Sequence, residues 1–204
     1  MLFKGVRTSG KQGAKARLLQ PFTSLLIRFN GRNELKVGQQ VEPDQVGFGL
    51  VGVQLYSGLY LNELLVRLLH REEPYVSLFD HYRTALLNLQ RGDLEPTLRQ
   101  FEHQLLAELG YALDLQQDSV GTPVHPQSLY LYQPDLGFSL IEELPQKSEL
   151  SAYCFAGSQL LAIHNGEYKD SDVLKAAKRL SRLALQPHLG DKPLRSRELF
   201  TQLR

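Results

Sequence analysis

The stretch Asp170-Ser-Asp-Val-Leu-Lys-Ala-Ala-Lys-Arg-Leu-Ser-Arg-Leu-Ala-Leu-Gln-Pro-His-Leu-Gly190 predicts an amphipathic helix near the C-terminus. Asp170, Ser171 and Asp172 offer N-cap oxygens and first-turn negative charge, and Pro187 and Gly190 are expected to stop the helix. The apolar residues recur at helical spacing and form one stripe: Val173, Ala176, Ala177, Leu180, Leu183 and Ala184. We therefore expect this helix to pack one face against the rest of the protein.

The opposite face of the same helix carries positive charge. Its cations are Lys175, Lys178, Arg179 and Arg182, and a second cluster follows at Lys192, Arg195 and Arg197, ahead of the apolar pair Leu199–Phe200. A helix that packs on one side and is basic on the other suits an anionic partner. A solvated face without any partner explains the charge pattern equally well.

Three more helices are predicted between residues 54 and 110. Gln54–Leu69 is apolar on most of its circumference, which indicates a central, buried helix. The second helix is expected to end before Gly92, and its apolar stripe is Tyr75, Phe79, Tyr82, Leu86 and Leu89. The third helix has Pro96 in its first turn and is expected to end before Gly110. Its apolar stripe is Leu98, Phe101, Leu105 and Leu109. Their short connections favour antiparallel neighbours.

The strand candidates fall in two regions. The first region contains three strand candidates and a basic loop from Thr8 to Ala16; the strands are Leu2–Val6, Leu18–Phe29 and Glu34–Val41. In the second region, Leu129–Gln133 and Phe138–Glu142 flank a turn, which predicts a small hairpin. A short helical turn is expected at Ser158–Ile163. The sequence therefore predicts an α+β fold, with part of a β-barrel in residues 1–45 followed by a mainly helical domain in residues 46–204.

Composition narrows the class of protein. The 204 residues suffice for one large or two small domains, and a hydrophobic content of 42% is enough for an ordinary core. Net charge is only +1, but seven cations precede the first acid, Glu34. Cys154 is the single cysteine, which excludes a disulfide framework and a multi-thiolate zinc site within one chain. Without a long apolar run or a secretory signal, we expect a soluble cytoplasmic protein.

A search for catalytic chemistry returns no candidate. Gly47-Phe-Gly-Leu-Val-Gly52 has the spacing of a dinucleotide-binding loop, but the preceding segment is polar and contains Pro43, unlike a buried parallel strand. The six histidines lack metal-site spacing, and Cys154 is typical of a small core residue. No Walker A sequence or nucleophile elbow is present. We expect no catalytic residue, no metal and no cofactor.

Five stretches of the sequence are informative through their wording. They are Leu19-Gln-Pro-Phe-Thr-Ser-Leu-Leu-Ile-Arg-Phe29, Leu55-Tyr-Ser-Gly-Leu-Tyr-Leu-Asn-Glu-Leu64, Leu98-Arg-Gln-Phe-Glu102, Leu174-Lys-Ala-Ala-Lys-Arg-Leu180 and Lys192-Pro-Leu-Arg-Ser-Arg-Glu-Leu-Phe200. Together they resemble the RecO family of bacterial DNA repair proteins. Because the matches keep their order over most of the chain, they are a far more specific signal than any single motif.

The resemblance implies a recombination mediator and not an enzyme. Such a protein binds single- and double-stranded DNA, anneals complementary strands, and works with RecR to load RecA onto DNA coated by single-stranded-DNA-binding protein. The family fold is an N-terminal OB-fold barrel followed by a helical domain, which in many members holds a four-cysteine zinc module. This chain resembles the branch without zinc. Residues 1–17 resemble the third barrel strand and the basic loop after it, so the first two strands have no counterpart here.

Two sets of site residues follow from the basic clusters and the resemblance. The expected DNA contacts are Lys4, Arg7, Lys11, Lys15, Arg17, Lys175, Lys178, Arg179, Arg182, Lys192, Arg195 and Arg197. Arg99 matches the arginine with which the family holds the acidic C-terminal tail of single-stranded-DNA-binding protein. We expect its guanidinium to be free to bind the tail. We expect the aliphatic part of its side chain to border an apolar slot formed by Leu98, Phe101 and Leu105.

Other interpretations of these residues stay open. Lys178, Arg179 and Arg182 would attract the acids of the tail only if their helix packs beside Arg99. Alternatively, Arg99 merely pairs with Glu102 or His103 on the surface of its own helix, where the contact would matter little. At the level of function, the rivals are an adaptor that docks acidic proteins without binding DNA, and a nucleotide-dependent enzyme that uses Gly47–Gly52.

Overall fold

The chain divides into two compact units in the computed structural model. The structure describes residues 2–3, 18–31, 36–45, 47–70, 73–145 and 148–201. The first unit spans Met1–Val51 and the second Gly52–Arg204. Within the described residues no helix is long and apolar enough to cross a membrane.

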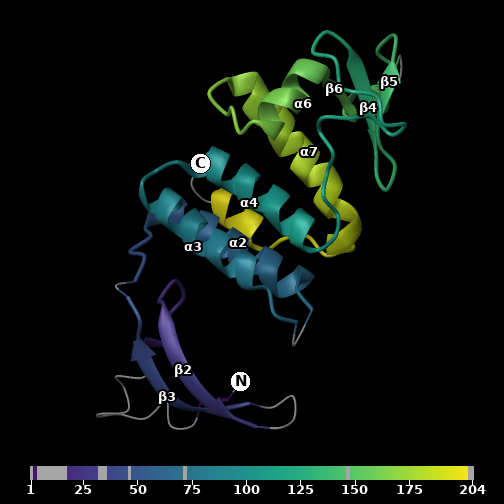
Figure 1. Ribbon diagram of the computed structural model, residues 1–204. Helices are drawn as coiled ribbons and strands as arrows, with labels where there is room; N and C mark the ends of the chain where they lie inside the picture. Colours follow the sequence, from purple (N-terminus) through teal and green to yellow (C-terminus); the bar gives the residue numbers. More distant parts are fainter. Residues whose placement is uncertain are drawn as a thin grey trace. The chain divides into compact units, whose positions relative to one another are not determined.

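The first unit contains a three-stranded sheet, β1 (Leu2–Phe3), β2 (Leu25–Asn30) and β3 (Val37–Pro43), in the order β1-β3-β2. β3 pairs in parallel with β1 and antiparallel with β2, its longer neighbour (Figure 1). β2 begins later than the sequence predicts because the chain turns at Pro21–Phe22, where Phe22 has φ 64°. Among the described residues this sheet does not close into a barrel, and the predicted basic loop lies outside them.

The second unit begins with the three predicted helices, α2 (Gly52–Leu68), α3 (Val76–Gln90) and α4 (Leu94–Glu108). Their apolar residues form a common core, in which Leu64, Leu89 and Leu105 are fully buried. The predicted stripe of α3 needs one correction, because Phe79 is 59% exposed and Leu78 is buried instead. Gly92 and Gly110 follow α3 and α4 with φ of 92° and 85°, a left-handed conformation that glycine adopts without steric cost. The prediction of these three helices is confirmed.

The basic stretch near the C-terminus forms α7 (Ser171–Leu189), and its capping is as expected at the start. The Asp170 carboxylate accepts a hydrogen bond of 2.7 Å from the Asp172 amide. At the other end the prediction needs a correction, because the helix runs through Pro187 and ends before Gly190. A proline two residues before the end removes only one hydrogen bond of the last turn, so the helix tolerates it there.

The remaining elements surround a second small sheet, in the order β5-β4-β6. β4 (Leu129–Gln133) and β5 (Gly137–Ile141) are the predicted hairpin, and β6 (Cys154–Ala156) pairs antiparallel with β4. Three short helices complete the unit: α5 (Ser148–Ser151), α6 (Gly157–His164) and α8 (Ser196–Thr201). Figure 1 shows α6 and α7 beside this sheet. The α+β prediction is confirmed, although α5, β6 and α8 were not predicted.

Candidate functional site

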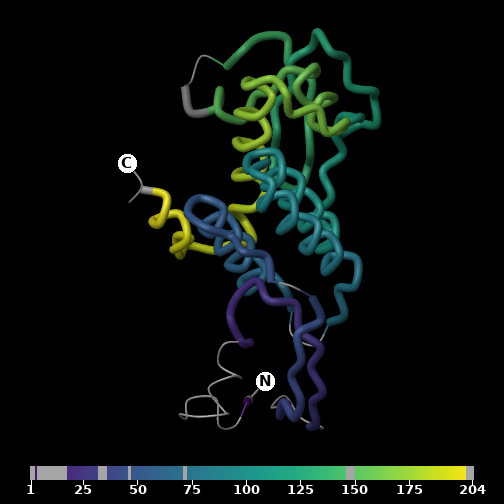
Figure 2. Tube along the Cα trace, turned by 90° about the vertical axis from the view of Figure 1, so that its left-hand side faces the viewer, coloured from purple at the N-terminus to yellow at the C-terminus, as the bar shows by residue number. Residues whose placement is uncertain are grey.

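A pocket of about 420 Å³ opens among α2, α4, α7 and α8. Its lining combines four cations, one acid and three residues with apolar or aromatic surface: Arg99, Lys178, Arg182, Arg197, Glu95, Leu98, Tyr60 and Phe200. Figure 2 shows the C-terminal segment, in yellow, returning beside α2, in blue, and α8 thereby supplies one wall. We call it the cationic pocket, because an anion with an apolar end fits this lining best.

Arg99 lies at the base of the cationic pocket and is 4% exposed. Its Nη1 forms an ion pair with Oε2 of the fully buried Glu102, at 2.8 Å, and the Tyr60 hydroxyl donates a 2.6 Å hydrogen bond to Oε1 of the same carboxylate. Burial raises the pKa of Glu102, and the guanidinium of Arg99 opposes this by favouring the carboxylate. The expectation of a free head is wrong. The alternative pairing of Arg99 with Glu102 is confirmed, but the pair is buried and does not lie on the helix surface.

One polar atom of Arg99 is left without a hydrogen bond. Its Nε is buried and has no hydrogen-bond acceptor among the described residues. Oε2 of Glu95 is 3.8 Å from this Nε, while Oε1 of Glu95 accepts a hydrogen bond of 2.7 Å from Lys178 Nζ. A buried N–H without an acceptor costs free energy unless a ligand atom bonds to it. Arg99 Nε is therefore an unsatisfied donor buried in the wall of the cationic pocket.

The structure places α7 against α4, and three cations of α7 have partners within the fold. Lys178 bonds to Glu95, and Lys175 lies 2.9 Å from Asp172 in the first turn of α7 itself. Arg179 donates to the Cys154 carbonyl oxygen at 2.7 Å and lies 4.4 Å above the Phe155 ring centroid. The predicted uniformly basic face is wrong, because these three cations have partners within the fold.

Arg182 differs from the other cations of α7. It is exposed, lines the cationic pocket and makes no ion pair with the described residues. Arg197, on α8, has the same properties. Two further predicted DNA contacts, Lys192 and Arg195, are exposed but do not line the pocket. The structure does not describe the predicted contacts near the N-terminus, which are Lys4, Arg7, Lys11, Lys15 and Arg17. Arg182 and Arg197 are thus the cations that an incoming anion can reach most easily.

Of the predicted apolar slot, only one residue lines the pocket. Leu98 contributes to the wall, whereas Phe101 and Leu105 are 1% and 0% exposed and belong to the core. Phe200 takes their place from α8, with its ring edge-on to Tyr56 at a centroid distance of 6.0 Å. The spacing of α4 alone could not reveal Phe200, because α8 is distant in sequence and returns only in the folded chain.

Glu63 and Arg67, one turn apart on α2, hold the C-terminal segment in place. Glu63 accepts hydrogen bonds from the Arg195 amide at 2.9 Å and from the Ser196 amide and hydroxyl at 2.8 and 2.6 Å. Arg67 donates to the carbonyls of Leu189, Lys192 and Pro193. Burial raises the pKa of Glu63, but these hydrogen bonds outweigh burial and lower it overall. The sequence analysis did not predict this contact. The signal that could have indicated it is a pair of charged residues, one turn apart, on an otherwise apolar helix.

His103 lies next to the buried ion pair and is sensitive to acid. Its side chain is partly buried, and its Nε2 has no hydrogen-bond partner among the described residues. Burial, with a contribution from the positive charge of Arg99, lowers the pKa of His103 from 6.5 to about 4. His103 is therefore neutral in the folded protein at neutral pH.

We expect the neutral state of His103 to make stability depend on pH. In the unfolded chain the imidazole binds a proton near pH 6.5, whereas the folded chain resists protonation down to about pH 4. The stability that His103 contributes is therefore present above pH 6.5 and is lost as pH falls toward 4, by about 2 kcal/mol for a partly buried group. Chemical unfolding at pH 7 and pH 4.5 should show a smaller loss for His103→Gln than for the wild type. Parallel losses would contradict this role.

The other motifs do not form sites in the structure. After Gly47–Gly52 the chain enters α2 and continues into α3 and α4, without the strand that a dinucleotide-binding unit requires. Among the described residues, no group of three or more His, Cys, Asp or Glu is placed to hold a metal ion. Cys154 is a buried free thiol in β6, as expected for a core residue.

Comparisons with known proteins agree over nearly the whole chain. The family model described as "Recombination protein O C terminal" matches residues 51–198. The DNA repair protein RecO of Yersinia enterocolitica (serotype O:8) is 45% identical over 207 aligned residues, which cover 99% of this chain and 82% of the relative. The proteins of the same name from Yersinia pestis (strain Pestoides F) and Yersinia pseudotuberculosis (serotype O:1b) match with the same identity and coverage.

Proposed function

The chain belongs to the RecO family of DNA repair and recombination proteins, which are mediators and not enzymes, and from this membership we propose that it is a recombination mediator of the bacterial nucleoid. In this proposal it binds single- and double-stranded DNA, anneals complementary strands, and acts with RecR to help load RecA onto DNA coated by single-stranded-DNA-binding protein. Residues 1–45 are the DNA-binding part, which corresponds to part of an OB-fold barrel, and residues 46–204 form the helical part that contacts protein.

The observation that carries the protein-binding half of this proposal is that exposed cations and apolar side chains line the same pocket. Arg182 and Arg197 are exposed, and Leu98 and Phe200 belong to the same lining. An acidic tail that ends in an aromatic residue supplies the matching groups, carboxylates for the two cations and a ring for the apolar wall. Glu102 holds the Arg99 guanidinium in place in this lining, so less of the pocket has to become ordered on binding.

A charge-matched pair of variants tests this assignment. Replacing Arg182 and Arg197 together by alanine should weaken binding of a labelled acidic peptide with a C-terminal phenylalanine roughly tenfold, because two charge-assisted contacts are lost. The control replaces Lys175 and Lys192, which are also exposed but do not line the pocket. Fluorescence anisotropy measures both affinities. Equal losses in the two double variants would show that only net charge matters, and would remove the pocket from the proposal.

The DNA-binding half of the proposal rests on the exposed cations outside the pocket and on the basic loop near the N-terminus. Lys192 and Arg195 have no ionic partner among the described residues and remain candidates for phosphate contacts. Lys178 and Arg179 have intramolecular partners, so we assign them to the fold instead. The alternative is an adaptor that binds acidic proteins only, and the cationic pocket by itself is equally consistent with it.

A further inference from the structure

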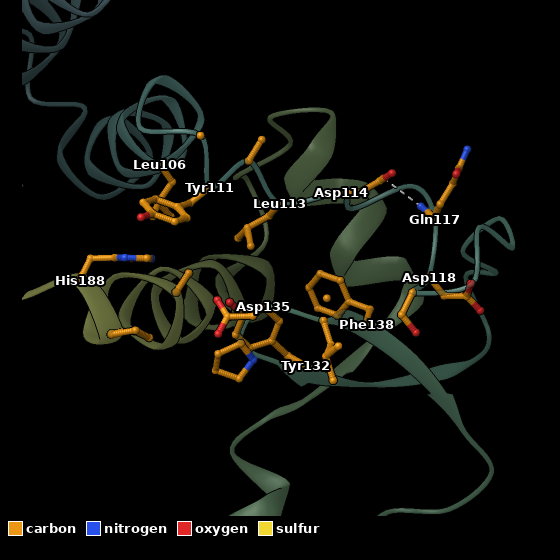
Figure 3. A pocket seen from close by; sticks show the side chains of 18 residues that line it. Leu106, Tyr111, Leu113, Asp114, Gln117, Asp118, Tyr132, Asp135, Phe138 and His188 are labelled. Carbon is orange, nitrogen blue, oxygen red and sulfur yellow. Dashed lines mark hydrogen bonds between the residues drawn. The ribbon is translucent and has the colours of Figure 1, made fainter. Parts of the chain in front are cut away.

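A second pocket, of about 360 Å³, lies between the C-terminal end of α7, the segment after α4 and the β4–β5 hairpin (Figure 3). It shares Pro134 and Pro187 with a neighbouring pocket of about 560 Å³. The two pockets are therefore neighbours, and we refer to them together as the hollow. The proposed function uses neither of them.

The charge of this hollow is opposite to that of the cationic pocket. Asp114, Asp118 and Asp135 line the first part and Asp191 the second, and none of the described lining residues is a lysine or an arginine. Asp114 and Asp118 each use Oδ1 to cap backbone amides of their own loop, and the second oxygen of each accepts no hydrogen bond within the described part of the chain. Such a lining repels phosphate and attracts a cation.

The walls between these carboxylates are aromatic. Tyr132 and Phe138 are buried neighbours at a centroid distance of 5.3 Å, and Tyr111 stacks on His188 at 3.8 Å with an interplanar angle of 29°. Asp135 sits at the hairpin turn with φ 65°, and Figure 3 shows its carboxylate directed toward α7. Burial and the negative charge of Asp135 raise the pKa of Tyr132, as expected for a carboxylate close to that hydroxyl.

We propose that this hollow binds an arginine side chain from a basic segment of a partner protein. A guanidinium is planar, so it can lie against the exposed Tyr111 ring while its fork bonds to the Asp135 carboxylate. A lysine ammonium could pair with the carboxylate, but it is not planar and could not stack on the ring. The exposed side chains of Tyr111 and Leu136, at 48% and 64%, provide apolar contacts for the residues on either side of that arginine. One helical unit then carries two docking sites, one for an acidic and one for a basic protein segment.

The test compares two probes that differ only in charge. The tripeptide acetyl-Leu-Arg-Leu-amide is titrated into the full chain and followed by the amide NMR signals of Tyr111, Asp135 and Leu136, with the citrulline analogue as the neutral control. We expect saturable shifts with the arginine peptide and at least tenfold weaker binding of the citrulline peptide, because a charge-assisted bond is lost.

Asp135→Asn is the matched variant, because asparagine tolerates the left-handed backbone of this turn and removes only the charge. It should keep the wild-type unfolding midpoint and bind the arginine peptide at least tenfold more weakly. Equal binding of the two peptides, unchanged affinity in the variant, or no saturation up to roughly 10 mM peptide would overturn the proposal. The same shifts on addition of oligothymidylate would overturn it too, since they would make the hollow a nucleic-acid site.

Discussion

Replacing Arg99 by alanine is expected to lower the free energy of unfolding by about 3–5 kcal/mol, because it leaves Glu102 fully buried without its cation. The sequence alone suggested little loss of stability, since Arg99 was expected on the helix surface. Urea unfolding followed by circular dichroism measures the difference. The control is Arg182→Ala, which removes an exposed cation from the same pocket and should change stability by less than about 0.5 kcal/mol.

A double variant separates the loss of the ion pair from the loss of packing. Arg99→Met combined with Glu102→Leu removes both charges and keeps similar volume, so it should recover much of the stability that Arg99→Ala loses. The Tyr60 hydroxyl then loses its acceptor, which limits the recovery. An Arg99→Ala protein within 1 kcal/mol of the wild type would show that the buried pair contributes little. Any loss of peptide binding in that stable variant could then be assigned to the cationic pocket directly.

The second large effect concerns DNA. Replacing Lys11, Lys15 and Arg17 together by alanine is expected to weaken binding to single-stranded DNA roughly a hundredfold near 0.1 M salt, and to flatten the plot of log affinity against log salt by about two units. The reason is the release of fewer counterions when three phosphate contacts are lost. Binding should weaken alike for all DNA sequences. Lys175→Ala, whose cation is paired with Asp172, is the control. An unchanged slope would remove these three residues from the DNA contact.

Local structure could be predicted well because it depends on neighbours in sequence. The stripes of α3 and α4 and the glycines that follow them placed both helices to within about two residues, and the turn around Asp135 placed the β4–β5 hairpin. The elements that were not predicted depend on contacts with residues that are distant in sequence. β6 is too short to show a period and is stabilised by pairing with β4. α8 begins at Ser196 because Glu63, far away on α2, bonds to its first amides.

The candidate site shows the same limit. The resemblance singled out Arg99, and the spacing of α4 placed Leu98 beside it, but neither could show that Glu102 holds the guanidinium below the surface. The charges of α7 were visible in the sequence, whereas their partners Glu95 and the Cys154 carbonyl lie on other elements. A cation that is exposed on its own helix becomes structural once a second element packs over it. Partners of this kind can be found only in the folded chain.

The central claim is that this protein is a mediator that binds DNA directly and not only an adaptor. Anisotropy of labelled single-stranded oligonucleotides, titrated with the intact chain over a series of salt concentrations, tests it most directly. The account predicts binding with little sequence preference, and a log affinity that falls linearly with log salt at about 0.7 units for each phosphate contacted. Absence of DNA binding at low salt, in a chain that still binds the acidic peptide, would contradict the claim and leave the adaptor.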